Sequence, residues 1–128
     1  MSYHFSKKLD LPFDQAVARV MEALKREGFG ILTDIDVKAT IKSKLGEEFR
    51  AYRILGACNP PLAFRALQLE DKIGTMLPCN VIVQEHQSGG VEVSAVDPVA
   101  SMQAVDNPGL ADVAKEVQAK LKRVVEGL

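Results

Sequence analysis

Ser88, Gly89 and Gly90 separate two segments in which apolar and polar residues alternate, at positions 79–86 and 91–96. Alternation is typical of a strand with one buried face, and adjacent glycines supply the positive φ angles that a tight turn needs. The pattern therefore predicts an antiparallel hairpin. The apolar side chains of its two strands are expected to share the buried face; they are Val81, Val83, Val91, Val93 and Ala95.

Two longer segments space their apolar residues at the helical period instead. The first begins at Phe13 and ends before Gly28, a residue suited to the left-handed turn that follows a helix. The second begins at Asn107 and Pro108, a capping residue followed by one that is favoured in the first turn. Both segments carry charged residues on their other face, so we expect two helices that each bury one side.

Shorter patterns complete the expected order of elements. Strands are expected at 3–9, 30–35 and 49–57, and short helices at 37–45 and 60–69. The helix at 37–45 is expected to present three apolar residues on one face: Val37, Ile41 and Leu45. Parallel strands covered on both faces would read as unbroken apolar runs. We therefore expect an α+β fold, with an antiparallel-rich five-stranded sheet packed by two long helices plus short helices.

Size and charge limit the class of protein further. The 128 residues are expected to form a single domain, 1–128. Sixteen Lys and Arg residues and 17 Asp and Glu residues leave a formal net charge of −1, which argues against binding to nucleic acid or an anionic membrane. The start lacks the apolar run of a secretory signal, and no stretch is apolar enough to cross a bilayer, so we expect a cytoplasmic protein.

Two Cys-Asn dipeptides stand at the ends of expected strands, Cys58-Asn59 followed by Pro60, and Cys79-Asn80. Asn59 and Pro60 are typical of a helix cap and first turn, which places Cys58 beside a helix N-terminus. The helix dipole there favours thiolate over thiol, so we expect Cys58 to be more acidic than an isolated cysteine. The alternative is that both cysteines are small buried hydrophobes and both asparagines are cap or turn residues.

A shared pocket for the two sulfurs would require the two strand ends to lie side by side. The pair would then suit a reversible disulfide, a soft metal ion or a thiol-borne sulfur atom. The chain contains no Cys-x-x-Cys motif and no third thiol, so the pattern identifies no metal site, no cofactor and no catalytic residue. His4 and His86 are its only imidazoles, and both are expected to be exposed and solvated.

Five basic residues gather in one short stretch, which suits docking of a phosphate or a carboxylate. They are Lys38, Lys42, Lys44, Arg50 and Arg53. Acidic residues lie among them, so a solvated and mutually compensated surface is the expected alternative.

Four segments together resemble one family of bacterial and archaeal proteins, the domain of unknown function, family 302. They are residues 27–33, 52–60, 77–81 and 97–98, and the likeness spans nearly the whole chain. The resemblance implies a small α+β fold similar to the half-unit of the TATA-binding protein, assembled as a homodimer. It brings no known activity and no DNA binding. The family's motif positions are Cys58, Asn59, Pro60, Cys79 and Asn80.

Three hypotheses about function follow. In the leading one, the protein is a dimeric binding module whose pocket near Cys58 and Cys79 holds a small ligand, a soft metal ion or a thiol-borne sulfur. In the second, it is a thiol enzyme of reduction or sulfur transfer, with Cys58 as nucleophile and Cys79 as resolving thiol. In the third, it is a structural protein in which the motifs pack a homodimer.

Overall fold

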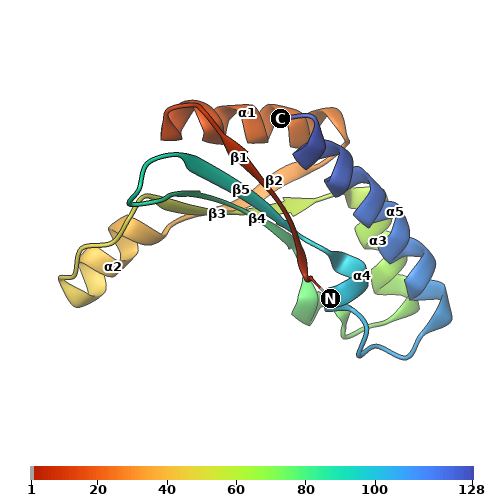
Figure 1. Ribbon diagram of the computed structural model, residues 1–128. Helices are drawn as coiled ribbons and strands as arrows, with labels where there is room; N and C mark the ends of the chain where they lie inside the picture. The colour runs from red at the N-terminus through yellow and green to blue at the C-terminus, as the bar shows by residue number, and fades with distance from the viewer. Residues whose placement is uncertain (1) are drawn as a thin grey trace.

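The computed structural model describes residues 2–128, which form one five-stranded sheet and its helices (Figure 1). The sheet order is β1-β5-β4-β3-β2, and every neighbouring pair is antiparallel. The strands are β1 His4–Leu9, β2 Gly30–Asp36, β3 Tyr52–Cys58, β4 Cys79–Glu85 and β5 Val91–Val96. The helices are α1 Phe13–Arg26, α2 Val37–Leu45, α3 Pro60–Leu69, α4 Pro98–Ser101 and α5 Pro108–Glu126, with a 3-10 turn, η1, at Ile73–Met76. The expected α+β class is confirmed.

The hairpin between β4 and β5 forms as the glycines predict. Gly89 and Gly90 adopt φ angles of 89° and 86° in the connection. Val83 pairs with Val93 and Val81 pairs with Ala95, so the apolar side chains of both strands share one face. All four of these side chains are fully buried.

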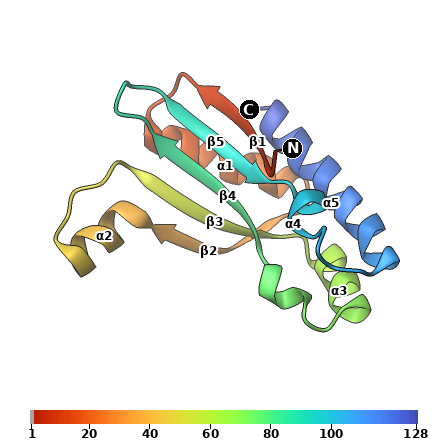
Figure 2. The same ribbon diagram turned by 60° about the horizontal axis from the view of Figure 1, so that its bottom comes forward.

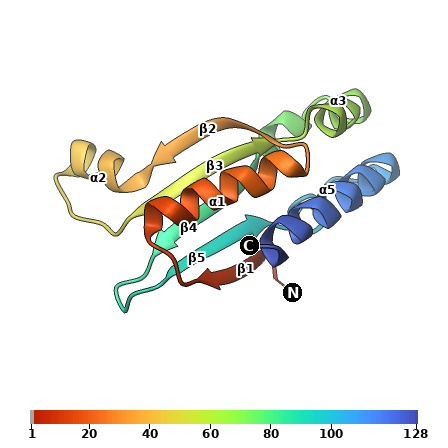
Figure 3. The same cartoon turned by 90° about the horizontal axis from the view of Figure 1, so that it is seen from above.

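The long helices α1 and α5 lie on the same face of the sheet (Figures 1 and 3). Their apolar stripes meet the buried sheet residues in one continuous core, which includes Leu24 of α1 and Leu121 of α5. The other face of the sheet is curved inward and carries none of the helices of residues 2–128 (Figures 1 and 2). One covered face and one open face match the alternating pattern of the strands.

The residues that the sequence predicts to cap or end the helices lie at the ends of α1 and α5, although not every one caps as expected. The backbone N–H of Phe29 donates to the carbonyl of Leu24, and Gly28 adopts φ 85° to close α1. Asn107 precedes α5 as expected but makes no capping hydrogen bond. Its Nδ2 instead donates to the carbonyl of Leu69 at 2.8 Å, which links the start of α5 to the end of α3.

The helix α2 departs from expectation in its packing. Its bounds agree with the sequence pattern, but none of its residues is buried, and Leu45 is 71% exposed. The reason is that α2 projects beyond one end of the sheet, where its main contacts are with β2 and β3 (Figure 1). The apolar face formed by Val37, Ile41 and Leu45 therefore has no full partner among residues 2–128.

Two short elements were not expected, α4 and η1. Each spans four residues, which is too short for a periodic apolar pattern. The Asp97 carboxylate caps α4 by accepting from the backbone N–H groups of Val99 and Ala100. No helix in the described part of the chain is long and apolar enough to span a membrane.

Candidate ligand-binding cavity

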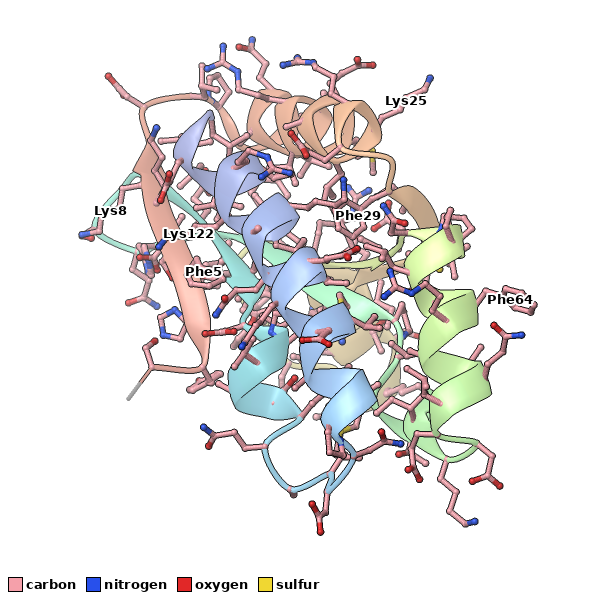
Figure 4. The ribbon with its side chains drawn as sticks, turned by 90° about the vertical axis from the view of Figure 1, so that its right-hand side faces the viewer. Phe5, Lys8, Lys25, Phe29, Phe64 and Lys122 are labelled. Atoms are coloured by element: carbon pink, nitrogen blue, oxygen red, sulfur yellow. The ribbon has the colours of Figure 1, made fainter. Side chains whose placement is uncertain are left out.

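An apolar cavity of about 330 Å³ lies at the end of the sheet where β3 stops and β4 starts. The helices α3 and α5 form its sides, and α4, η1 and the sheet end close it (Figure 4). Leu32 and Leu67 both line the cavity and are exposed, so it opens between β2 and α3. Its lining residues are Phe29, Leu32, Ala57, Cys58, Asn59, Leu62, Ala63, Ala66, Leu67, Gly74, Leu77, Pro78, Cys79, Pro98, Met102, Val113, Ala114 and Val117.

Asn59 positions α3, which forms one wall of the cavity. Its Oδ1 accepts from the backbone N–H of Leu62 at 3.4 Å, which caps α3. Its Nδ2 donates to the carbonyl of Glu27 at 3.4 Å, just beyond the end of α1. The asparagine of the first Cys-Asn motif thus joins two helix ends beside the cavity, with one hydrogen bond to the protein from each end of its amide.

A close approach of three segments sets the neighbouring wall. A Cβ atom on Gly56 would lie 2.1 Å from Thr33 Oγ1 and 2.8 Å from Pro78 Cγ. Only glycine leaves room for both contacts. The Leu77–Pro78 peptide bond is cis, and both residues line the cavity directly before β4.

The two thiols border the same cavity without forming a pair. Cys79 is buried and Cys58 is half-buried, and both are free. The direct partner of Cys79 across the β3–β4 ladder is Ala57, and Cys58 is the next residue along β3, so its side chain alternates away from that position. The condition set for a shared pocket is met, since the strand ends are adjacent and both thiols line one cavity, but the sulfurs are not near each other and form no cysteine pair.

The expected acidity of Cys58 is wrong in direction. Burial raises the pKa of the Cys58 thiol, although a helix begins two residues later. The Asn59 side chain accepts a hydrogen bond from the backbone N–H of Leu62, so this N–H at the start of α3 is not free to stabilise a thiolate. Burial also raises the pKa of Cys79, from 9.0 to about 11, with a smaller contribution from negative charge on Cys58. Both thiols are protonated at neutral pH.

The remaining motif positions lie away from the cavity. Pro60 is exposed in the first turn of α3. Asn80 is exposed on the open face of the sheet, opposite the face that carries Cys79. Of the five expected site residues, the cavity brings together Cys58, Asn59 and Cys79.

Metal-binding and acid–base groups are not gathered at this cavity. In residues 2–128 no cluster of three or more His, Cys, Asp or Glu side chains could hold a metal ion. His4 bonds to Ser6 through Nδ1, His86 bonds to Glu92 through Nε2, and neither histidine lines the cavity. The cavity is suited to an apolar molecule rather than to a metal ion.

Sequence reasoning missed most of the cavity wall. Phe29, Ala63 and Val113 belong to patterns that indicate ordinary core packing, and Figure 4 shows Phe29 between α3 and α5 while Phe64 points away from the molecule. The available signal was the small side chains along α3, Ala63 and Ala66, which leave space opposite α5. Small residues on a core-facing helix are too common to identify a cavity without the tertiary structure.

The comparisons agree with this architecture. These residues form an antiparallel α+β protein with a helix-covered sheet and a cavity at one end. The family model described as Domain of unknown function DUF302 matches residues 5–128, and the chain belongs to this family. It is similar to the crystal structure of uncharacterized conserved protein DUF302 from Bacillus stearothermophilus, with a TM-score of 0.91, 26% sequence identity and 98% of each chain covered. The comparison with curated proteins gave no match.

Proposed function

We propose that this protein is a binding module that holds one small, largely apolar molecule in the cavity between α3 and α5. The observation that carries the proposal is the size and lining of the cavity. Ligand pockets of proteins begin at roughly 300 Å³ and are mostly apolar with a few polar groups. This one measures about 330 Å³, and its polar atoms are confined to Asn59, the two thiols and the backbone.

The volume indicates the size of the ligand. An apolar cavity of roughly 150 Å³ accepts benzene, so a cavity about twice as large suits a molecule of naphthalene size or a short branched hydrocarbon. The Asn59 amide already makes one protein hydrogen bond from each end, and the other lining side chains apart from the two thiols are apolar, so the ligand has few strong polar partners there. The protonated thiols add a polarizable wall that favours aromatic or sulfur-containing groups.

The thiol chemistry considered from the sequence receives less support. A thiolate is the form that attacks a disulfide or binds a soft metal ion, and burial raises the pKa of both thiols. The thiols also lack a third ligand in the described residues. We therefore favour reversible binding of an intact molecule over the thiol-enzyme and metal-binding alternatives.

Fluorescence titration with 1-naphthylamine tests the proposal. The emission of this probe shifts to the blue in apolar surroundings, and we expect that shift on addition of the wild-type protein. Ala63→Phe fills the cavity from α3 and is expected to weaken binding at least tenfold, because the probe loses the volume it needs. Ala119→Phe places the same side chain on the exposed face of α5 and is expected to leave affinity unchanged.

A second cavity-filling variant distinguishes an effect of lost cavity volume from an effect of misfolding. Gly74→Leu enters the cavity from η1, where a Cβ atom meets only Leu67 Cδ2 at 3.9 Å. Circular dichroism should show native helix content in all three variants. No blue shift with wild-type protein, or equal affinity in the two cavity-filling variants and the wild type, would refute the proposed site.

We also propose that the protein assembles as a homodimer, as the family resemblance implies. The strand β2 is an edge strand, and together with α2 it exposes apolar side chains, among them Ile35 and Leu45. Exposed edges of this kind are commonly covered by a partner. Sedimentation velocity is expected to give a dimer for the wild type and a monomer for Ile35→Asp/Leu45→Asp. A wild-type monomer at high micromolar concentration would contradict this expectation.

A further inference from the structure

The open face of the sheet holds a second hollow, whose lining is mostly polar, unlike that of the apolar cavity. It measures about 440 Å³ and takes its walls from β1, β3, β4 and β5. Figure 2 turns this face forward and shows the strands in front of α1. Most of its lining side chains carry a hydrogen-bonding group: Tyr3, His4, Ser6, Tyr52, Asn80, Gln84, Glu92 and Ser94, with Ile82 and Val96 as the apolar members.

Arg50 does not itself line this hollow, but its guanidinium contacts two residues that do, Tyr52 and Gln84. Its guanidinium carbon lies 4.5 Å from the ring centre of Phe49 and 5.4 Å from that of Tyr52. Its Nε donates to Gln84 Oε1 at 3.0 Å, and both Gln84 and Tyr52 line the hollow. These contacts hold the guanidinium plane, and the only hydrogen bond of the group to residues 2–128 is the one from Nε. A guanidinium held in this way can donate two parallel N–H bonds to the oxygens of a carboxylate or a phosphate.

Arg50 differs in this respect from two other basic residues of its stretch, Lys42 and Arg53. Arg53 forms a two-bond ion pair with Asp34, and Lys42 pairs with Glu48. The sequence-based expectation of mutual compensation is met at those two residues. Glu92 is the acidic member of the hollow. It bonds to His86 Nε2 at 3.1 Å, and no ion pair joins it to Arg50 in residues 2–128.

A chain of hydroxyl groups occupies the other side. Ser6 Oγ lies 2.7 Å from His4 Nδ1 and 2.7 Å from Ser94 Oγ, across the β1–β5 ladder. Each hydroxyl retains capacity for a further bond, since it can both donate and accept. The exposed amide of Asn80 adds a donor and an acceptor on the same face. Such groups recognise the hydroxyls of a polyol.

We propose that this hollow binds a small hydroxyl-rich molecule that carries one anionic group, with the anion on Arg50 and the hydroxyls against Ser6, Ser94 and Asn80. The inference is independent of the apolar cavity, which lies on the other side of the sheet end. The proposed ligand would give the Arg50 guanidinium, which has no carboxylate partner in residues 2–128, an anionic partner next to a hollow lined mainly by polar side chains.

Isothermal titration with D-ribose 5-phosphate and D-gluconate tests the inference, and the tighter of the two identifies the preferred anion. Arg50→Gln is expected to weaken binding at least tenfold, because a charge-assisted bidentate contact is lost. Arg19→Gln removes the same charge from the exposed side of α1 and is expected to leave affinity unchanged. Ser94→Ala is expected to weaken binding of either probe about threefold to tenfold without changing the affinity for inorganic phosphate.

Four results would overturn the inference. They are absence of binding by both probes at millimolar concentration, equal loss of affinity in Arg50→Gln and Arg19→Gln, and inorganic phosphate binding as tightly as ribose 5-phosphate. The fourth is a change of the amide resonances of Ser6, Asn80 and Ser94 with protein concentration alone, which would show that a second copy of the chain covers this face.

Discussion

Leu121→Ala is expected to lower the free energy of unfolding by about 2–5 kcal/mol, the range for truncation of a fully buried leucine. Leu121 has no exposed surface and lies in the apolar stripe by which α5 joins the core. Truncation removes favourable burial and leaves a void that rigid neighbours fill only in part. Urea denaturation followed by circular dichroism measures the change.

The same substitution at Leu45 provides the matched control. Leu45 is also a helical leucine, but it lies at the end of α2 and is largely exposed. We expect Leu45→Ala to change the free energy of unfolding by no more than about 0.5 kcal/mol in the monomer. Equal effects at the two positions would contradict the assignment of the core to the face covered by α1 and α5.

Alkaline pH is expected to destabilise the protein through Cys79 by roughly 2 to 3 kcal/mol. Burial raises the pKa of this thiol from 9.0 to about 11, so between these pH values the unfolded chain releases a proton that the folded chain retains. Proton release by the unfolded state favours unfolding as pH rises, and each pH unit in that window is worth about 1.4 kcal/mol. The contribution is complete below pH 9 and is lost as the pH rises through 11.

Cys79→Val isolates this contribution from other groups that titrate in the same range. Valine is close to cysteine in size, suits a buried strand position and does not ionise. Urea denaturation at pH 8 and at pH 11 should show a smaller loss of stability in the variant than in the wild type. Parallel pH profiles for the two proteins would mean that Cys79 is accessible to water in the folded state.

The fold was predictable where short-range chemistry decides it. Gly89 and Gly90 determine the hairpin, and Gly28 ends α1, because few other residues adopt their backbone angles. The face of α2 was not predictable in the same way. Its apolar residues are spaced as in a helix that packs against a core, yet Leu45 stays largely exposed because no helix or strand of residues 2–128 covers it.

The candidate site was predictable only in part, because it depends on tertiary packing. The two Cys-Asn motifs correctly identify adjacent strand ends, and Cys58 and Cys79 do border one cavity. Strand alternation then separates the sulfurs and sends Asn80 to the open face. The dipole argument for Cys58 considered the helix alone, whereas the apolar walls that raise its pKa come from segments distant in the sequence.

The position of the expected ligand can be measured directly by intermolecular nuclear Overhauser effects between bound 1-naphthylamine and the protein. We expect contacts from the aromatic protons of the probe to methyl groups of Leu62, Ala66 and Val117, which lie on the two facing helices. Contacts confined to exposed side chains such as Tyr3 or Leu45, with none to these methyl groups, would contradict a binding function for the cavity.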